Sequence, residues 1–286
     1  MRNKTLYIYT ENLNFFYRLN KELRQLGVKF TILNTTAKIP DNLSLILTTL
    51  SEISNIKNSY KDLKVLPYSE KTSFKKYILK VLSAYRIGYK ESYSHLIFSI
   101  DPGSKYIGII IFLDDFYLMS QTLYEKRKFI EIIKNYVNCF QNENSNALEL
   151  TFKFGSGVLS ITIDLIKEVY NIFKNRKNVK VFLIDESKSS KLKLQLRNKG
   201  ISKHEISALI LALRHGVEVN ESNYFNTLKQ IKCTNSNIIN NSENDFKKNR
   251  ELSIELKDII KKILNSELSL SSSSSLVRKA KKVINF

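Results

Sequence analysis

The chain has 286 residues, of which 43% are hydrophobic, and this is enough to bury one large core or two smaller ones. Its formal charge of +19 favours phosphate-rich partners, with nucleic acid as the leading class; a lysine-rich composition bias is the alternative explanation. The two cysteines, Cys139 and Cys233, lie far apart, which excludes a disulfide framework and a zinc site of ordinary spacing. We expect a reduced intracellular protein.

The first 92 residues predict a small α/β domain. Strands are predicted at 5–10, 29–33, 43–48 and 65–67, and helices at 12–26 and 73–85. Gly27 follows the first helix as a C-cap. No glycine-rich phosphate loop is present, and Glu11 or Asn12 after the first strand suits a helix cap as well as a ligand. We expect this domain to be an accessory nucleic-acid surface or a docking unit.

Residues 93–219 predict a mixed sheet with flanking helices. Strands at 96–100, 106–113 and 116–121, joined by tight turns, form an antiparallel meander. Helices at 125–140, 158–173 and 203–215 then alternate with strands at 147–152 and 179–184. The carboxyl ends of parallel strands meet at one edge of such a sheet. Acids far apart in the sequence are therefore expected to converge there, namely Asp101, Glu149 and the pair Asp185–Glu186.

The segment IDPGSKYIG at 100–108 is the most informative part of the chain, because it leads a strand directly into a turn. Pro102 fixes the first corner, and Gly103 is predicted to take the positive φ of a type II turn. Asp101 is then held at the rim of the sheet. Its alternative role is to start an Asx turn before the proline. The apolar run that follows, Tyr106 to Leu113, is too short to cross a bilayer, and we expect no membrane contact.

The order of elements resembles the RNase H-like superfamily, and within it RuvC-type Holliday-junction resolvases and YqgF-type nucleases. The segments that carry the resemblance are IDPGSKYIGI at 100–109, ALEL at 147–150 and KHEISALILALRHG at 203–216. The resemblance covers about residues 97–219. It implies an RNase H-like fold and a nuclease that hydrolyses branched or structured DNA, with DNA ahead of RNA as the partner. It also implies Mg²⁺ or Mn²⁺ as the cofactor.

The resemblance implies a set of acidic ligands. Asp101 matches the acid of the D-x-G motif after the first strand, and Glu149 matches the acid in the fourth strand. The positions ahead of the last helix are His204, Glu205 and Ser207, and IDESKSS at 184–190 resembles the YqgF-type D-E-R motif and adds Glu186. The implied catalytic residues are Asp101, Glu149, His204 and Glu205, and the implied metal ligands are Asp101, Glu149, Glu186 and Glu205. Two ions roughly 3.5–4 Å apart would activate water and stabilise the leaving oxygen.

Each of these residues has a structural alternative. Glu149 lies in an apolar strand and needs a partner, which a lysine would supply as well as a metal. Ser202 and Glu205 form the S-x-x-E pattern of a capping box, and His204 is also typical of an ordinary surface histidine. Ser207 stands where resolvases carry an acid, which leaves open a catalytically inactive module that binds nucleic acid or acts as a scaffold. The first hairpin also resembles the phosphate-binding hairpin of actin-like ATPases, although the sequence shows no second copy.

Basic residues are predicted to contact nucleic acid around the site, and a solvated surface is the alternative for them. They are Lys105, Lys153, Lys188, Lys191, Lys193, Arg197, Lys199 and Lys203.

Residues 220–286 predict a polar linker, a basic amphipathic helix and a serine-rich tail. The segment 235–249 is rich in Asn and Ser, and SLSSSSS at 269–275 is of low complexity. Between them, apolar residues repeat at helical spacing. These are Leu252, Leu256, Ile259, Ile260 and Ile263. The sequence leaves open whether this helix packs on the core, binds a protein partner through residues 250–264 or adds basic contacts, and whether the protein is a homodimer. We expect a soluble, cytoplasmic location.

Overall fold

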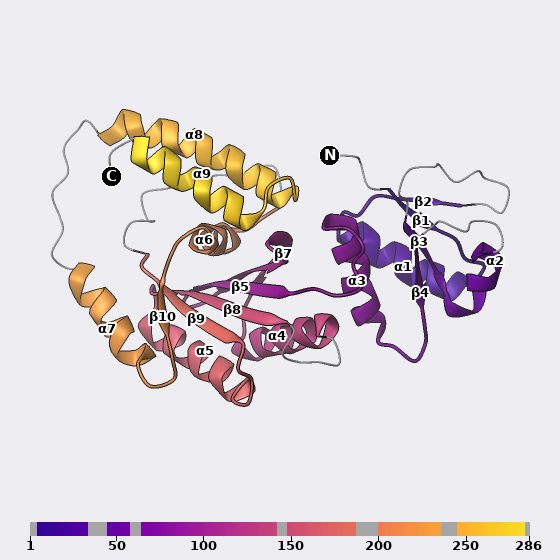
Figure 1. The fold of residues 1–286 in the computed structure, drawn as a ribbon, viewed down its shortest axis with the longest axis horizontal. Helices are drawn as coiled ribbons and strands as arrows, with labels where there is room; N and C mark the ends of the chain where they lie inside the picture. The colour runs from indigo at the N-terminus through magenta and orange to yellow at the C-terminus, as the bar shows by residue number, and fades with distance from the viewer. Residues whose placement is uncertain are drawn as a thin grey trace. The chain divides into compact units, whose positions relative to one another are not determined.

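The computed structural model describes residues 5–33, 45–57, 64–141, 148–186, 200–235 and 245–283. The chain divides into two compact units, Met1–Glu91 and Ser92–Phe286. Each unit has its own sheet with helices packed around it (Figure 1). The α/β class predicted from the order of elements is therefore confirmed. No helix of the described segments is long and apolar enough to span a membrane.

The first unit contains a parallel four-stranded sheet in the order β2-β1-β3-β4. The strands are β1 (Leu6–Ile8), β2 (Phe30–Ile32), β3 (Leu45–Thr49) and β4 (Lys64–Tyr68). The helices are α1 (Leu13–Gln25), α2 (Ile53–Lys57) and α3 (Phe74–Arg86), with the short 3₁₀ helix η1 (Leu50–Glu52) ahead of α2. The predicted strands and both predicted helices are present. Two short helices, η1 and α2, were not predicted; they follow β3 without an intervening loop.

Helix α1 has the caps that its flanking residues predict. The side-chain oxygen of Asn12 accepts a hydrogen bond from the backbone amide of Phe15 at 2.9 Å. Gly27 has φ +64, a conformation that favours glycine, just after the helix ends. Of the two roles left open for Asn12, the structure shows the helix cap.

The second unit contains a six-stranded mixed sheet in the order β10-β9-β8-β5-β6-β7. The strands are β5 (His95–Pro102), β6 (Ile107–Leu113), β7 (Phe116–Leu123), β8 (Glu149–Gly155), β9 (Val179–Ile184) and β10 (Val217–Val219). The helices are α4 (Lys126–Phe140), α5 (Leu159–Ile172), α6 (Lys203–Ala212), α7 (Tyr224–Asn235), α8 (Asp245–Leu264) and α9 (Leu270–Val283). The predicted antiparallel meander β5-β6-β7 is confirmed, and β8 and β9 extend the sheet in parallel on the other side of β5.

The turn between β6 and β7 is a two-residue hairpin loop. Its residues Asp114 and Asp115 have φ values of 46° and 74°, as a type I′ turn requires. The side chain of Asp115 accepts a hydrogen bond from the Ser271 amide at 3.0 Å, and its carbonyl accepts one from Leu270 at 2.7 Å. The hairpin thus fixes the start of α9.

The two faces of this sheet are covered by different helices, α4 and α5 on one side and α6 on the other (Figure 1). Aromatic side chains fill the first face: Phe98 stacks on Phe152 at 5.0 Å between ring centroids, and Phe154 contacts Phe129 of α4 at 6.3 Å. On the opposite face, the hydroxyl of Ser99 donates to the carbonyl of Ala208 in α6 at 2.8 Å. Because side chains alternate along a strand, Asp101 shares the α6 face with Ser99.

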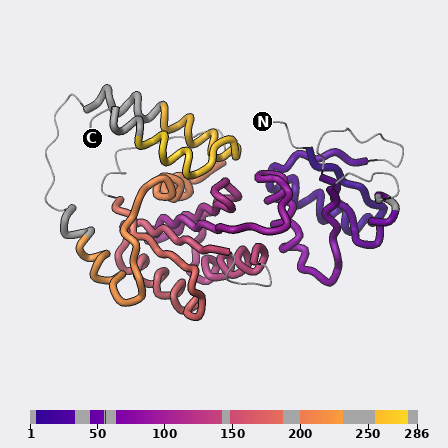
Figure 2. The backbone as a smooth tube through the Cα atoms, in the orientation of Figure 1, coloured from indigo at the N-terminus to yellow at the C-terminus, as the bar shows by residue number. Residues whose placement is uncertain are grey.

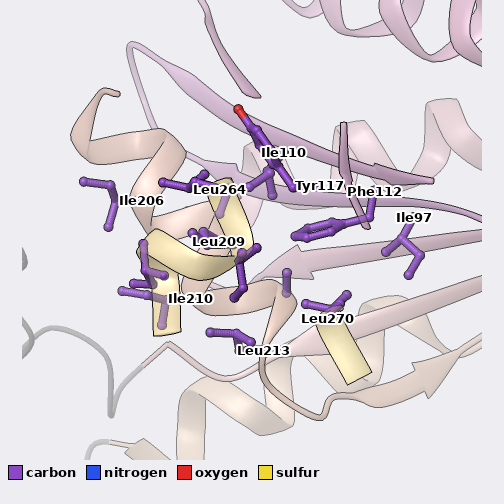
Figure 3. Close-up of a cluster of buried hydrophobic side chains, with 14 of the residues drawn as sticks. Ile97, Ile110, Phe112, Tyr117, Ile206, Leu209, Ile210, Leu213, Leu264 and Leu270 are labelled. Atoms are coloured by element: carbon purple, nitrogen blue, oxygen red, sulfur yellow. The ribbon is translucent and has the colours of Figure 1, made fainter. Parts of the chain in front are cut away.

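Helix α6 is itself covered by α8 and α9, which lie side by side over it (Figures 1 and 2). Figure 3 shows the resulting cluster, which contains Leu209 of α6, Leu213 directly after α6, and Leu264 and Leu270 from the last two helices. A helix that is buried on all sides is apolar all round, which explains the run ALILAL in α6. Of the roles left open for the amphipathic helix at 250–264, the structure shows packing on the core.

The serine-rich run at 269–275 is mostly helical, because it forms the first turns of α9. Ser273 is fully buried, and its hydroxyl donates to the carbonyl of Ser269 at 2.7 Å. Ser266, in the turn before α9, donates to the carbonyl of Tyr117 at 3.2 Å. Small hydroxyl side chains let this segment lie against the sheet while their polar groups stay hydrogen-bonded within the chain.

Candidate functional site

Asp101 lies at the carboxyl end of β5, and the turn that follows differs from the prediction. Strand β5 continues through Pro102, which pairs with Ile107, and the amide of Gly103 donates to the carbonyl of Tyr106 at 2.9 Å. Among the described glycines, those with positive φ are Gly27, Gly88 and Gly200, so the type II turn with positive φ at Gly103 was wrong. Glycine is required there for space, because a Cβ would lie 2.6 Å from the Tyr106 carbonyl oxygen.

The start of α6 brings His204 to Asp101. The two side chains approach to 3.4 Å between His204 Nδ1 and Asp101 Oδ2. Ser202 caps the helix by accepting the amide of Glu205 at 3.2 Å. A Cβ at Gly108 would overlap the backbone carbonyl of His204, so the glycine allows the helix to begin directly on β6. The contact is therefore positioned by local features of two distant segments.

The environment of Asp101 perturbs its ionisation. Only 15% of the side chain is exposed, and this burial raises the pKa of Asp101 above its usual range. The nearby His204 and hydrogen bonds from His204 and Ser207 pull the pKa down but do not cancel the effect of burial. Ser207 stands at the position where the resemblance predicts an acid, and its side chain hydrogen-bonds Asp101. A carboxyl group with a perturbed pKa at a strand end is typical of functional sites.

Glu186 lies at the same edge of the sheet as Asp101. Register places Ile100 beside Phe154 and Phe154 beside Leu183, so β5 and β9 end at the same edge. Asp101 is the next-to-last residue of β5, and Glu186 follows the end of β9 by two residues. Strands β5 and β9 are separated by β8, a span of about 10 Å. The Glu186 carboxylate accepts the amide of Gly157 at 3.0 Å and occupies space that a Cβ at Gly155 would fill.

Arg214, after the carboxyl end of α6, holds the loop that carries Glu186. Its guanidinium donates to the carbonyl of Asp185 at 2.9 Å. Burial lowers the pKa of Arg214, and the nearby carboxylates of Asp185 and Glu186 oppose that change. Helix α6 therefore contacts the edge at both of its ends.

Glu149 does not join this edge, contrary to the expected convergence. Its register partner is His95, at the start of β5, six residues before Asp101. At about 3.3 Å per residue the two acids are about 20 Å apart along the strands. Glu149 pairs instead with Lys180, whose Nζ lies 2.8 Å from its Oε1. The lysine partner considered as the alternative for Glu149 is the one that the structure shows.

Glu205 is buried and turned toward β7. Its carboxylate accepts hydrogen bonds from the hydroxyls of Ser120 at 2.5 Å and Thr122 at 2.9 Å. Thr122 also bonds the capping residue Ser202 at 2.5 Å. These contacts give Glu205 a structural role in joining α6 to β7.

Three of the basic residues predicted to bind nucleic acid are described. Lys105, in the turn after Asp101, and Lys203, beside His204, are exposed. The ammonium of Lys153 instead donates to the carbonyls of Ala212 and Arg214, at 2.5 and 2.9 Å, and caps α6. Burial lowers the pKa of Lys153 to about 8. The remaining residues lie outside the described part of the chain: Lys188, Lys191, Lys193, Arg197 and Lys199.

Two tyrosines near the Asp101–His204 contact were not predicted as site residues from the sequence. The ring of Tyr106 lies 5.2 Å from the His204 ring and 5.3 Å from the ring of Tyr124. Tyr106 directly precedes Ile107, and Tyr124 directly follows its register partner Leu123. This position at the ends of two neighbouring strands was the signal in the sequence that could have revealed their contact. Within the described residues, no group of three or more His, Cys, Asp or Glu side chains is arranged to hold a metal ion.

The first unit has a separate polar cluster at the carboxyl ends of β1 and β3. The carboxylate of Glu52 accepts hydrogen bonds from the hydroxyls of Thr10, Thr48 and Thr49. The amides of Glu11 and Thr49 also donate to it, at 2.6 and 3.2 Å. Partial burial raises the pKa of Glu52, but these bonds outweigh it and leave the pKa below its usual range.

Comparison with known proteins gives a match for the first unit. Residues 5–77 match a family described as response regulator receiver-like domain. No curated protein sequence matches the chain.

Similar solved structures are distant from this chain. A Bacteroides thetaiotaomicron protein with an actin-like ATPase fold is 16% identical, with a TM-score of 0.23 over 47% of this chain and 46% of that one. Kluyveromyces polysporus Argonaute with a guide RNA is 14% identical, with a TM-score of 0.24 over 64% and 33%. The C-terminal lobe of a budding yeast Argonaute is 13% identical, with a TM-score of 0.24 over 64% and 55%. The matches thus cover at most 55% of these chains.

Proposed function

We propose that the second unit is an RNase H-like module that binds structured nucleic acid, DNA ahead of RNA, at the sheet edge carrying Asp101, His204 and Glu186. The strand order supports the fold assignment, because antiparallel β6 and β7 lie on one side of β5 and parallel β8 and β9 on the other. This is the arrangement that the sequence resemblance implies.

The observation that carries the proposal is the contact between Asp101 and His204. It joins the end of the central strand to the start of a helix far along the chain, beside the exposed lysines Lys105 and Lys203. In a protein with a charge of +19, these lysines suit phosphate contacts at the edge.

A second candidate is a nuclease that uses Mg²⁺ or Mn²⁺ at this edge. Asp101 favours it, because it combines burial, a raised pKa and a histidine partner. Mg²⁺ in proteins is commonly bound through one or two carboxylates and keeps several waters, which fits Asp101 with Glu186. Such an ion would activate a bound water toward a phosphodiester. His204 would hold Asp101 in place, and Glu149 takes no part because it lies at the opposite edge.

A paired substitution separates the two candidates. The full chain is incubated with labelled four-way junctions, hairpins and RNA–DNA hybrids in EDTA, Mg²⁺ or Mn²⁺, and both binding and cleavage are measured. Glu149→Gln is the matched control for Asp101→Asn, because it neutralises an acid at the other end of the same sheet. Cleavage that Asp101→Asn alone abolishes supports the nuclease, and binding without cleavage in every metal supports the module. The absence of binding to all substrates would refute both.

A further inference from the structure

Three aromatic rings form a continuous row that leads to Asp101. Tyr124 contacts Tyr106 edge to face, with 5.3 Å between ring centroids and 78° between the ring planes. Tyr106 in turn lies 5.2 Å from the ring of His204, whose Nδ1 is 3.4 Å from Asp101. We call Tyr124, Tyr106 and His204 the aromatic row.

The row is exposed at its outer end and fixed at its inner end. The exposed fraction of Tyr124 is 74% and that of Tyr106 is 37%. Tyr106 precedes β6, whose residues are all buried, and Tyr124 follows β7, which ends at the buried Leu123. The inner end is fixed because His204 belongs to the first turn of α6, whose backbone lies against Gly108. Single exposed aromatic residues need no explanation. Two exposed tyrosine rings in contact with each other, one of which also contacts the histidine beside the mostly buried Asp101, form a surface that leads to this acid.

The charges around the row indicate its ligand. Lys105 precedes Tyr106, Lys203 precedes His204, and Arg127 lies three residues after Tyr124; all three are exposed. A ligand that suits this surface has flat π faces separated by anionic groups. Unpaired nucleotides have that chemistry, because each base stacks on an aromatic ring while the backbone phosphates contact the cations. Bases within a duplex are already stacked and offer no free face.

We propose that the aromatic row binds single-stranded nucleic acid by stacking unpaired bases on Tyr124 and Tyr106, and so leads the strand toward Asp101. This inference rests on the proposed nucleic-acid binding of the second unit and specifies its substrate: junctions, flaps, loops or other structures that contain unpaired bases. It does not depend on whether the edge cleaves the strand.

The test compares oligonucleotides that differ only in their bases. Fluorescence anisotropy measures the affinity of the full chain for a short oligo-dT strand, an abasic strand of the same length and a duplex. Stacking of a base on an aromatic ring adds to single-strand affinity, so Tyr106→Ala and Tyr124→Ala should each weaken oligo-dT binding by roughly tenfold. The abasic strand should bind the wild type more weakly than oligo-dT does, and the two alanine variants should not weaken it further.

Controls distinguish the rings from other effects. Tyr17→Ala removes a tyrosine of similar exposure, 73%, from α1 of the first unit and should leave binding unchanged. Tyr106→Phe and Tyr124→Phe keep the rings and should bind oligo-dT like the wild type, and circular dichroism checks that each variant is folded. Wild-type affinity in both alanine variants, or equal binding of abasic and oligo-dT strands, would overturn the stacking site while the proposed function stands. A wild type that binds no nucleic acid would overturn both.

Discussion

Glu52 offers a direct test of how the first unit is held together, because its carboxylate joins the ends of β1 and β3. The change is Glu52→Gln, which keeps the size of the side chain but removes its charge and one of its two acceptor oxygens. The donors around it are the Glu11 and Thr49 amides and the hydroxyls of Thr10, Thr48 and Thr49. The single side-chain oxygen of glutamine cannot accept all of these hydrogen bonds. Its amide nitrogen is itself a donor, so the groups that face it lose their acceptor.

The expected loss follows from the number of charged bonds. A hydrogen bond to a charged group contributes about 1.5–3 kcal/mol, and a neutral one about 1 kcal/mol. Weakening two such bonds, with a discount for partial exposure to solvent, gives a loss of about 1–2 kcal/mol in the free energy of unfolding. For a unit of this size that corresponds to a fall of about 5–10 °C in melting temperature. Glu70→Gln, at an exposed acid of the same unit, should change stability little.

The effect must also depend on pH in a defined direction. The pKa of Glu52 is lower in the folded state than its ordinary value of about 4.3. Its contribution is therefore fully present above that value and is lost as the pH falls through the folded pKa. The gap between wild type and Glu52→Gln should be constant near neutral pH and should close in acid.

The assay must report on the first unit, and tryptophan fluorescence is not a probe because the chain has no tryptophan. Hydrogen exchange of the Tyr9 and Leu33 amides serves, because they bond to the carbonyls of Leu47 and Ile8 across the β1 pairs. Thermal unfolding followed by circular dichroism gives the melting temperature. Equal stability of Glu52→Gln and Glu70→Gln at pH 7, or a gap that persists unchanged in acid, would refute the reasoning.

Four further predictions concern the second unit. Because burial raises the pKa of Asp101, its ionised form is disfavoured in the folded state. Asp101→Asn should therefore raise the melting temperature at pH 7 but not at pH 3, where the acid is protonated in the unfolded state too. A melting temperature of Asp101→Asn below that of the wild type at pH 7 would contradict this prediction. Glu205→Ala should cost about 2–3 kcal/mol in urea unfolding, since it removes the buried acceptor of Ser120 and Thr122; a change within error would show that the hydroxyls bond elsewhere. Gly108→Ala should lower the free energy of unfolding by about 3 kcal/mol or more, because the added Cβ would overlap the His204 carbonyl. The His204 ring resonances should also shift in NMR spectra. If the variant is as stable as the wild type, α6 lies further from β6 than the structure shows. Asp115→Ala should cost about 1 kcal/mol and speed hydrogen exchange of the Ser271 amide, and unchanged exchange would mean that the hairpin does not fix α9.

The sequence predicted those features that local chemistry determines. The strand and helix order follows from apolar periodicity, the C-cap at Gly27 from its conformational freedom, and the tight turn after residue 113 from the two residues that separate two predicted strands. Asp101 was placed correctly at a strand end, because the run before it is apolar and the turn after it is short. These predictions needed no knowledge of what lies on the neighbouring strand.

The remaining errors concern pairing between distant segments. Strand β8 was predicted at 147–152 and runs from Glu149 to Gly155, so Glu149 lies at the beginning of the strand, far from the edge where Asp101 lies. An apolar run shows that a strand exists, but its register depends on partners that the run does not contain. The same reason explains Glu205, whose partners Ser120 and Thr122 lie on a strand more than eighty residues earlier.

Helix α6 explains how a site made from such distant parts is held in one geometry. It is fixed along its whole length, by Glu205 on β7, by Ala208 on Ser99 of β5, and by Lys153 of β8 at its carboxyl end. Helices α8 and α9 cover its outer side, so the helix has no face on which to move away from the sheet (Figure 3). His204 is therefore presented to Asp101 by a buried, rigid element and not by a loop, and rigid elements hold functional groups most accurately. The packing of the last two helices in this way helps to build the Asp101 edge, although the edge residues Asp101, His204 and Glu186 belong to other parts of the chain.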